Sequence, residues 1–281
     1  MNPVAALLSE NLKDMVRLGI GFPSRYARMA FSDVYVASVR GIGPIHLRKK
    51  SMDLWVLRQV FRTRQYELGH YPQAGRIDER YRQILEQGKI PLIVDAGANN
   101  GCSALWFAAK FPDSHVVAIE PDHQNSQICR MNTEKKSNIN VIEAAIGGSP
   151  GFVTLDNPDK QSWGVQTTRG GPGSKVEVRT VNDIVGSYGS KYELFIVKID
   201  IEGFERDLFS ENTGWLESPM VVIIELHDWK FPGQFSSVPF QRAIAKYKFE
   251  MMMSNENFVY IGEFKPSLNS HHLEPATAGV F

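Results

Sequence analysis

The stretch VDAGANNGCSALWFAAKF, residues 94–111, decides the fold that this 281-residue sequence predicts. An apolar run ends at an acidic residue, Asp95, and a glycine loop then leads into a second apolar segment with helical spacing. Glycines at positions 97 and 101 allow the loop to turn tightly and to lie close to a ligand. A strand, a tight loop and a helix in this order are typical of the first βα unit of a parallel sheet.

Further apolar runs follow along the chain, separated by segments of helical character. They are SHVVAIEP (114–121), INVIEAAIG (139–147), LFIVKIDIEG (194–203) and PMVVIIELHDW (219–229). Near-continuous apolar runs of this kind are typical of parallel strands that crossover helices bury on both faces. We therefore predict an α/β fold with a doubly wound, mostly parallel sheet.

Two other segments belong to the predicted sheet region. Residues 249–263 read as two strands joined at residues 255–257, and this pair would close the sheet with an antiparallel edge. Residues 151–180 are rich in glycine and in residues that favour strands. They predict an inserted hairpin and loop followed by a further strand.

The domain organisation follows from a change in sequence pattern near Pro91, where short apolar runs begin to alternate with helical segments. Residues 1–90 predict a helical extension or cap, residues 91–265 a ligand-binding domain, and residues 266–281 a C-terminal tail. Residues 51–68 predict a helix with one apolar stripe, which consists of Leu54, Leu57, Val60 and Phe61. Charged residues interrupt the first 22 positions, so these predict an amphipathic helix that packs on the body or on a partner, not a signal or a membrane anchor.

The composition limits the classes of partner. Lys and Arg number 31 and balance 31 Asp and Glu, which gives no reason to expect nucleic acid or an anionic membrane as the main partner. The short basic run at residues 46–50 is expected to be a solvated face. Cys102 and Cys129 fall on two successive predicted helices without a zinc-like or CxxC spacing, which fits a reducing cytoplasm.

Acidic residues end almost every predicted parallel strand. They are Asp95, Glu120, Asp200 with Glu202, and Glu225 with His227. Ligands of open parallel sheets bind at the carboxyl ends of the strands, so we expect these side chains to lie together. Alternation along a strand places Glu225 and His227 on one face, and Lys198 and Asp200 likewise. Because grouped carboxylates are costly unless cations or donors meet them, the site is expected to receive positive charge, hydroxyl groups or a metal.

The glycine loop narrows the choice of ligand. GANNG lacks the GxGxxG spacing of dinucleotide sites, and Asp95 would repel a pyrophosphate. A ligand with adenosine, a ribose, an ammonium and a sulfonium but no phosphate fits this edge better, and S-adenosylmethionine is such a ligand. Glu120 is placed to accept hydrogen bonds from both ribose hydroxyls, a device that NAD sites share. An NAD(P)-dependent oxidoreductase is therefore an alternative, as is a mere turn or capping role for these residues.

Six motifs resemble those of the FkbM-type family of S-adenosylmethionine-dependent methyltransferases. In order they are VDAGANNG, AIEPD, VIEAAIG, VRTVNDIV, VKIDIEGFE and IIELHDW. MDLWVLRQVFRTRQYEL resembles the lead-in segment of the family, so the resemblance spans about residues 45–265, and KIDIEGFE is its most specific piece. It implies a seven-stranded, Rossmann-like class I methyltransferase fold. It also implies methyl transfer to oxygen, commonly to a hydroxyl of a sugar, glycolipid or polyketide.

The resemblance also implies site residues. The loop at the methionine end of the cofactor would comprise Asp95, Gly97, Ala98, Asn99 and Gly101. Glu120 would hold the ribose, and Asp122 with residues 143–146, which include Ala144 and Ala145, would form the adenine wall. Where the family usually has an acidic pair, this chain has Asn182 and Asp183.

Methyl transfer requires an oxygen nucleophile in line with the sulfonium methyl and a group that takes the hydroxyl proton. The candidate catalytic residues are His227, Asp200, Glu225 and Glu202. His227 is the first candidate base because an unperturbed pKa of about 6.5 leaves it mostly neutral; a structural partner such as Glu225 would remove it from that role. Asp200 or Glu225 would then serve, or would hold a divalent cation such as Mg²⁺. Glu202 has the alternative of capping the next helix.

The acceptor is the least defined part of the prediction. Trp163, Trp229 and Phe231 fall in predicted loops that would cover a sugar face, with core packing as the alternative for each. Residues 228–237 follow the fifth strand directly and are expected to form part of the acceptor wall. A small-molecule or glycan acceptor is expected, while a protein that binds S-adenosylmethionine without catalysis is the rival from another class. The oligomeric state is left open.

Overall fold

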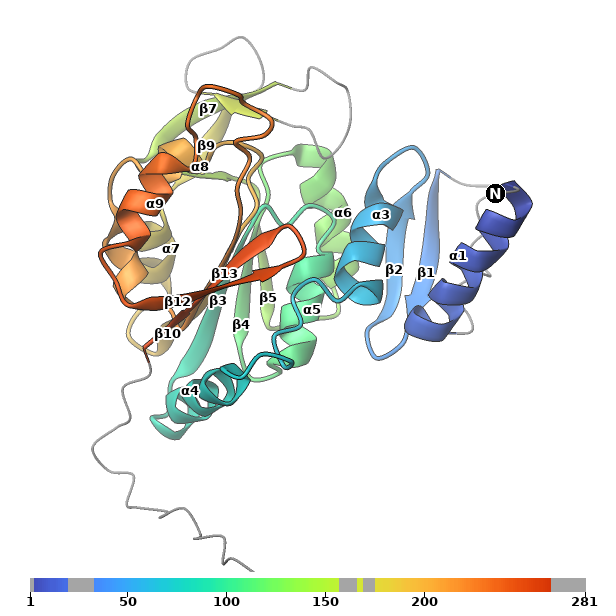
Figure 1. Ribbon diagram of the computed structural model, residues 1–281, viewed down its shortest axis with the longest axis horizontal. Coiled ribbons are helices and arrows are strands. Elements are labelled where there is room, and N and C mark those ends of the chain that lie inside the picture. Colours follow the sequence, from blue (N-terminus) through green and yellow to red (C-terminus); the bar gives the residue numbers. More distant parts are fainter. Residues whose placement is uncertain (1–2, 20–32, 157–165, 169–174, 264–281) are drawn as a thin grey trace, which may run out of the picture.

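The computed structural model describes residues 3–19, 33–156, 166–168 and 175–263, and a central sheet of seven strands runs through it (Figure 1). In spatial order the strands are β12 (Phe249–Ser254), β13 (Asn257–Gly262), β11 (Val221–Glu225), β10 (Tyr192–Ile199), β3 (Ile90–Ala96), β4 (His115–Ile119) and β5 (Ile139–Ile142). Only β13 runs antiparallel to its neighbours. The predicted doubly wound α/β fold and the terminal hairpin are confirmed, although the antiparallel strand lies one place inside the edge. The strand order reverses between β3 and β10, and ligands of such sheets bind at this point.

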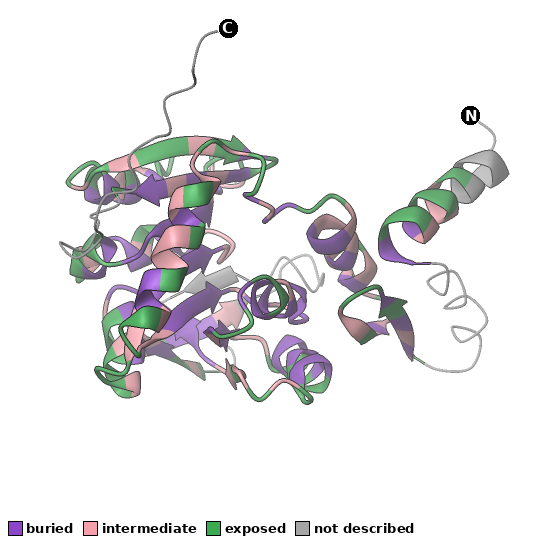
Figure 2. Ribbon diagram, turned by 90° about the horizontal axis from the view of Figure 1, so that it is seen from below, coloured by how far each residue is buried: buried purple, intermediate pink, exposed green. Residues whose placement is uncertain are grey.

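The strands are buried on both faces, and their side chains alternate between two cores. Ile93 belongs to the core on one face of the sheet, while Leu92 and Val94 belong to the core on the other. Figure 2 shows buried residues concentrated in the sheet and on the helix sides that face it. This double burial explains why the strands appear in the sequence as continuous apolar runs.

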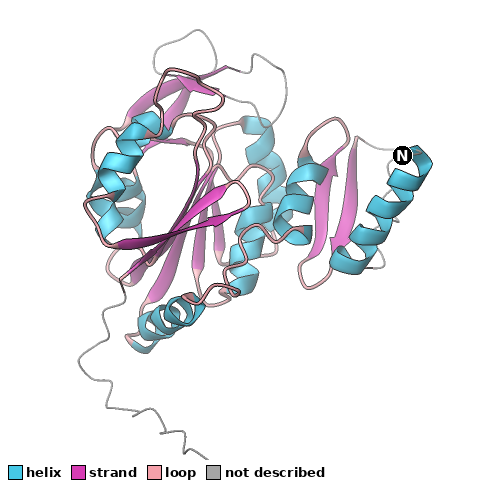
Figure 3. Cartoon of the chain, viewed as in Figure 1, coloured by secondary structure: helices cyan, strands magenta, loops and turns pink. Residues whose placement is uncertain are grey.

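Helices cover both faces of the sheet (Figure 3). One layer consists of α4 (Ala74–Glu86), α5 (Cys102–Lys110) and α6 (His123–Thr133). The other consists of α7 (Val181–Tyr188), α8 (Glu205–Leu208), the 3₁₀-helix η3 (Thr213–Glu217) and α9 (Val238–Ile244). Asp183 begins α7 in a capping box with Thr180, in which each side chain accepts a backbone N–H of the other. This contact accounts for the acid in VNDIV.

The N-terminal region is less helical than predicted. After α1 (Pro3–Leu18) the chain forms an antiparallel hairpin, β1 (Val34–Val39) and β2 (Gly43–Arg48). The prediction of a helical extension did not include this hairpin, although α1, α3 (Asp53–Leu57), η2 (Arg58–Arg62) and α4 make helix the main regular structure of the described part of the region. The alternating burial along β1 is a strand period, and the chain turns between the strands through glycines with positive φ at 41 and 43.

The prediction that the basic run at residues 46–50 is a solvated face is also wrong for most of the run. Its first three residues lie in β2, where Leu47 is fully buried. The Arg48 guanidinium donates to both carboxylate oxygens of Asp53, at 2.7 and 3.0 Å, and to the side chain of Asn125. The first part of the run is therefore a strand in which Arg48 is paired, and Lys50 at its end is exposed.

The predicted amphipathic helix α1 does pack on the body. Its Asp14 is fully buried and forms ion pairs with Arg58 at 2.7 Å and Arg62 at 3.2 Å. Both arginines belong to a π-helix, η2 (Arg58–Arg62), which continues α3 (Asp53–Leu57). No helix within the described residues is long and apolar enough to cross a membrane.

The third apolar run divides into two strands. Its first half is β5, while β6 (Ala145–Ile146) leaves the central sheet and pairs with β9 (Lys175–Arg179). With β7 (Gly151–Asp156) and β8 (Gln166–Thr168) these strands form a second sheet in the order β6-β9-β7-β8. The predicted hairpin and further strand are present in it, and Trp163 lies outside the described residues.

One side chain ties the N-terminal hairpin to the sheet domain. Asn132 of α6, 8% exposed, accepts the N–H of His46 at 2.6 Å and donates to the carbonyl oxygens of His46 and Asn100, at 3.1 and 2.9 Å. Removal of this amide would leave several buried backbone groups without partners.

We therefore expect Asn132→Ala to lower the free energy of unfolding by about 2 to 3 kcal/mol, measured by urea denaturation. Met131→Ala is the matched control, because its side chain is exposed on the same helix. Equal midpoints for the two variants would show that Asn132 does not anchor the hairpin.

Candidate active site

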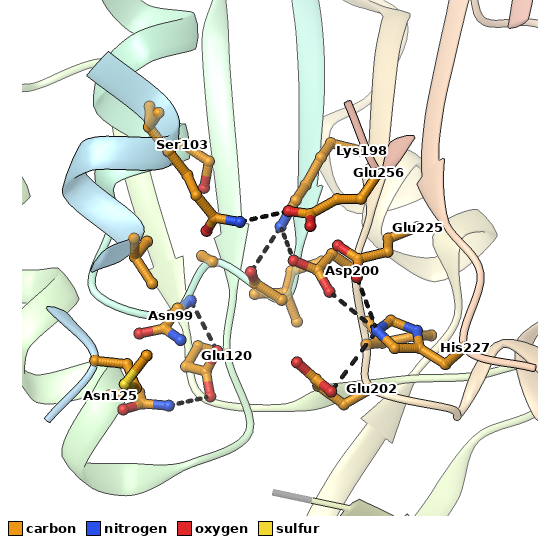
Figure 4. Close-up of a pocket in the computed structure, with 18 of the residues that line it drawn as sticks. Asn99, Ser103, Glu120, Asn125, Lys198, Asp200, Glu202, Glu225, His227 and Glu256 are labelled. Atoms are coloured by element: carbon orange, nitrogen blue, oxygen red, sulfur yellow. Dashed lines mark hydrogen bonds and ion pairs between the residues drawn. The ribbon is translucent and has the colours of Figure 1, made fainter. Parts of the chain in front are cut away.

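A cavity of ≈ 470 Å³ opens at the carboxyl ends of the central strands. The loops that follow β3, β4, β10 and β11 line it, together with β6, α3, η2 and the β12–β13 turn. In Figure 4, Glu120 with Asn99 and Asn125 lies on one side, and Asp200, Glu202, Glu225 and His227 lie on the other. The acidic strand ends other than Asp95 are thus brought together as predicted, on the two sides of one cavity.

The backbone conformation of the glycine loop after β3 is tightly restricted by its neighbours. Gly97 has a φ of 80°, and a Cβ there would lie 1.7 Å from the carbonyl oxygen of Asp200. The backbone N–H groups of Gly97 and Ala98 donate to the carbonyl oxygen of Ile119, at 2.9 and 3.0 Å. The loop therefore crosses directly over β10, and only glycine fits at its closest approach.

Asp95 lies in the core beneath this loop and is linked to it through Lys198. It is fully buried, accepts a hydrogen bond from Ser103 Oγ at 2.6 Å, and lies 3.2 Å from the Lys198 ammonium. Lys198 also donates to the carbonyl oxygen of Gly97 at 2.7 Å. The expectation that Asp95 offers an open negative charge is wrong, because Lys198 neutralises that charge inside the core.

Glu120 faces the cavity as predicted and is held by three donors. They are the backbone N–H of Asn99 at 2.8 Å, that of Asp122 at 3.0 Å, and the side-chain amide of Asn125 at 3.3 Å. Burial raises the pKa of Glu120 to about 7, against the lowering effect of these hydrogen bonds. Asn125 was not among the predicted residues.

Fewer residues line the cavity than were predicted for the adenine wall, which was Asp122 with residues 143–146. Asp122 caps α6 by accepting the Asn125 N–H at 2.8 Å, and Glu143 is engaged by Ser126 at 2.7 Å and by His123 at 2.9 Å. Ala144 is buried in the core beneath. The residues of the stretch that line the cavity are Ala145 and Ile146.

The four predicted catalytic side chains do converge. His227 Nε2 lies 3.5 Å from Glu225, 3.7 Å from Glu202 and 3.8 Å from Asp200, as Figure 4 shows. Glu225 and His227 lie close together as predicted, and Lys198 lies 3.8 Å from Asp200, although β11 ends at Glu225 and β10 at Ile199, so that the second member of each pair follows its strand. Burial and the Asp200 charge raise the pKa of Glu225 to about 8.

The partner of His227 is a residue that sequence reasoning missed. Glu205, on α8, lies 2.9 Å from His227 Nδ1, and both side chains are 1% exposed. Burial alone would lower the pKa of His227, but Glu205, Asp200 and Glu202 together raise it to about 9. The expected neutral histidine base is therefore wrong. The available signal was that Glu205 closes KIDIEGFE, the most specific of the motifs.

Glu202 does not cap the next helix. Its backbone has a left-handed φ of 55°, and its carboxylate accepts a hydrogen bond from Lys230 Nζ at 2.9 Å. The N-cap position of α8 is instead Phe204. The carboxylate of Glu202 consequently faces the cavity beside His227.

The wall built by α3 and η2 was not foreseen as part of the site. It contributes Met52, Trp55, Val56, Gln59 and Val60, followed by Gln65 and Tyr66. The Gln59 amide donates to Glu256, which closes the cavity from the β12–β13 turn. Trp229 also lines the cavity, whereas the Phe231 ring packs against the backbone of Gly203. Hydrophobic periodicity indicated only that residues 51–68 pack, not what they face.

The close contact at Gly97 yields the first prediction for the site. Gly97→Ala should lower the free energy of unfolding by at least about 3 kcal/mol, because the new Cβ meets backbone and the φ is unfavourable. Gly75→Ala, in open space on α4, should be neutral or stabilising. Denaturation of both variants measures the difference, and similar stabilities would contradict the crossing.

The raised pKa of Glu120 yields a second prediction. The folded state binds this proton more tightly than the unfolded chain, so the stabilisation is complete below pH 4.5 and is lost as the pH rises through about 7. Relative to Glu120→Gln, the wild type should lose on the order of 3 kcal/mol over that window in denaturation experiments. Glu86→Gln, an exposed control, should show no such window. Parallel pH profiles for wild type and Glu120→Gln would refute the shift.

Solved methyltransferase structures share distant similarity with the chain. Precorrin-6y C5,15-methyltransferase from Geobacter metallireducens is 12% identical, with 66% of this chain and 88% of that chain covered and a TM-score of 0.37. The N-terminal domain of human METTL16 in complex with SAH is also 12% identical, with 68% of each chain covered and a TM-score of 0.37. Similarity at this level carries no functional information.

Sequence relatives are closer. Methyltransferase 1 of Beauveria bassiana is 26% identical over 172 residues, which cover 52% of this chain and 67% of the relative. The 2-O-methyltransferase NoeI of Sinorhizobium fredii is 22% identical over 175 residues, 55% of this chain and 72% of the relative. The ribosomal RNA large subunit methyltransferase G of Magnetococcus marinus is 32% identical over 91 residues, 31% of this chain and 25% of the relative.

The family assignment rests on the segment that contains the cavity. The sequence pattern of the methyltransferase FkbM domain matches residues 95–259, from the end of β3 into β13. The match includes Glu120 and the whole acidic cluster around His227, and it covers more than half of the chain. This chain belongs to the FkbM methyltransferase family.

Proposed function

We propose that this protein is an S-adenosylmethionine-dependent O-methyltransferase that methylates a hydroxyl of a sugar, a glycolipid or a polyketide-type small molecule. The observation that carries the proposal is the division of one cavity into two chemically different sides. On one side the Glu120 carboxylate faces the cavity, and on the other side a cluster of carboxylates surrounds a buried histidine, His227. The first side suits a ribose, and the second suits an acceptor hydroxyl beside a sulfonium.

The donor would lie along the glycine loop. Glu120 would accept hydrogen bonds from the ribose hydroxyls, and Ala145 with Ile146 would pack against the adenine. The backbone of Ala98 and Asn99 would follow the methionine end, and Asp200, 26% exposed, would face the cationic part of the donor. Asp95 would take no direct part.

The reaction would be an in-line displacement. A lone pair on the acceptor oxygen attacks the methyl carbon, the carbon–sulfur bond breaks with its electron pair on sulfur, and the hydroxyl proton passes to a base. His227 holds its proton at neutral pH because of Glu205. Glu225, whose raised pKa of about 8 is nearer to neutral, or Asp200 would be the base, and transfer through Glu225 would rise as the pH rises through about 8. A general base accounts for roughly 10² to 10⁴ in rate.

The acceptor class is inferred from the mouth of the cavity. Trp55 and Trp229 line it and remain exposed, and aromatic faces pack well on the C–H surface of a sugar. The relative NoeI is a 2-O-methyltransferase, which agrees with a hydroxyl acceptor. The balanced net charge gives no support to a nucleic-acid acceptor. We place the reaction in the cytoplasm because Cys102 and Cys129 are free thiols.

Donor binding is the first test of the proposal. Calorimetry with S-adenosylmethionine should give saturable binding, and Glu120→Ala should weaken it by at least about 10-fold because the ribose loses its charged acceptor. Glu143→Ala is the control, since that carboxylate is held by Ser126 and His123 outside the cavity. Absence of binding to the folded wild type, or binding of NADH in its place, would overturn the proposal.

Methyl transfer is the second test. Incubation with methyl-labelled S-adenosylmethionine should label hydroxyl-bearing glycans, lipids or small metabolites from a fractionated extract. Glu225→Gln should slow transfer by about 10² or more while leaving donor affinity within a few fold. Label found solely in nucleic acid or protein would refute the acceptor class, and donor binding without any transfer would favour the non-catalytic alternative.

A further inference from the structure

We propose that Asp200, Glu202 and His227 form a binding site for one divalent cation, with Mn²⁺ as the best-matched ion. One carboxylate oxygen of each acid and a ring nitrogen of His227 all lie within 4.8 Å of one another. The three residues come from the end of β10, from the turn that follows it, and from the segment after β11. Binding of the cation does not depend on the proposed function, whereas its role in methyl transfer does.

The orientation of His227 is the observation that distinguishes this cluster from a group of exposed acids. The ring is 1% exposed, and its Nδ1 is engaged by the buried Glu205 at 2.9 Å. Within the described part of the chain, Nε2 makes no hydrogen bond and is directed into a group of three carboxylates, Glu225, Glu202 and Asp200, as Figure 4 shows. A carboxylate behind a histidine fixes the ring in this way at metal sites and leaves the second nitrogen for the ion.

The distances suit an ion between the side chains better than contact among them. Nε2 lies 3.7 Å from Glu202 and 3.8 Å from Asp200, which is too long for hydrogen bonds. Octahedral ligands at about 2.1 Å from an ion lie about 3.0 Å apart when adjacent and about 4.2 Å apart when opposite. The two separations from Nε2 fall between these values, and the three ligand atoms lie within 4.8 Å of one another, so side-chain rotations would bring all three to one ion.

The charge of the region also favours a cation. Its carboxyl groups are Asp95, Asp200, Glu202, Glu205, Glu225 and Glu256, and its cationic groups are Lys198, Lys230 and His227. The acids outnumber the bases in a half-buried setting where each uncompensated charge is costly. A divalent ion that replaces the Nε2 proton would reduce this excess.

The chemical types of the three side chains indicate which divalent ion fits the site best. Carboxylate oxygens suit Mg²⁺, Ca²⁺ and Mn²⁺, while imidazole suits later transition metals. A set with two carboxylates and one imidazole is best matched by an ion that accepts both, and Mn²⁺ does so. An ion held here would bind the acceptor oxygen and lower the pKa of its hydroxyl. Glu225, which faces the same nitrogen, would then be the group that accepts the proton.

The test is a titration of the chelator-treated full chain with Mn²⁺, in which electron paramagnetic resonance counts the free ion. We expect saturation at one ion per chain, with affinity at least about 10-fold lower in Asp200→Asn and His227→Gln. Glu205→Gln should weaken binding about 10- to 100-fold by releasing the ring. Glu202→Gln gives a fourth variant at a partly exposed position if a buried substitution prevents folding.

Glu256→Gln is the matched control, because it removes one acid from the same cavity outside the ligand set. The proposal is overturned if the folded wild type shows no saturable binding below about 1 mM, if Asp200→Asn and Glu202→Gln bind like wild type, or if Glu256→Gln weakens binding equally. Calorimetry with S-adenosylmethionine separates the two proposals. Donor binding without Mn²⁺ binding refutes the cation site alone, and Mn²⁺ binding without donor binding refutes the proposed function alone.

Discussion

The buried ammonium of Lys198 is the interaction on which the site depends. It lies 1% exposed between β3 and β10, contacts the carboxylates of Asp95 and Asp200, and donates to the carbonyl oxygen of Gly97. An ammonium at this depth is tolerated only because acids and carbonyl groups surround it. Through these contacts one charge fixes the glycine loop and the end of β10 relative to each other. The two sides of the cavity are therefore held in one geometry.

A second buried pair, His227 with Glu205, organises the opposite side in a similar way. Lys198 compensates acids within the sheet, while Glu205 keeps a proton on His227 and turns the free edge of the ring toward the cavity. The result is a protonated histidine among carboxylates, which is a poor base but a good donor, and which a cation would replace. The family motif KIDIEGFE contains Lys198, the cavity acids Asp200 and Glu202, and the buried Glu205. One short segment therefore supplies most of the charged groups around His227.

The lead-in segment gives the cavity a wall that the methyltransferase sheet itself lacks. The contacts of α3 and η2 with α1 and with the β1–β2 hairpin hold that wall through buried ion pairs, among them Arg58 with Asp14 and Arg48 with Asp53. A π-helix is uncommon and is found mostly at functional sites, which agrees with the position of η2 beside the cavity. The N-terminal region is thus part of the site and not a separate unit.

The sequence by itself determined the sheet and its ligand-facing edge, because buried parallel strands require continuous apolar runs and their ends meet at one place. Asp200, Glu202, Glu225 and His227 could be grouped on that basis, and Glu120 could be assigned to the other side. Only the tertiary structure decided that Lys198 neutralises Asp95, that Glu205 holds His227, and that the wall comes from residues 52–66. These contacts join segments far apart in the chain or depend on the path of a turn, and periodicity carries no information about either. The sequence therefore identified the acidic residues at the strand ends. Only the fold decided which of them are neutralised in the core and which line the cavity, because both depend on neighbours that are distant in the chain.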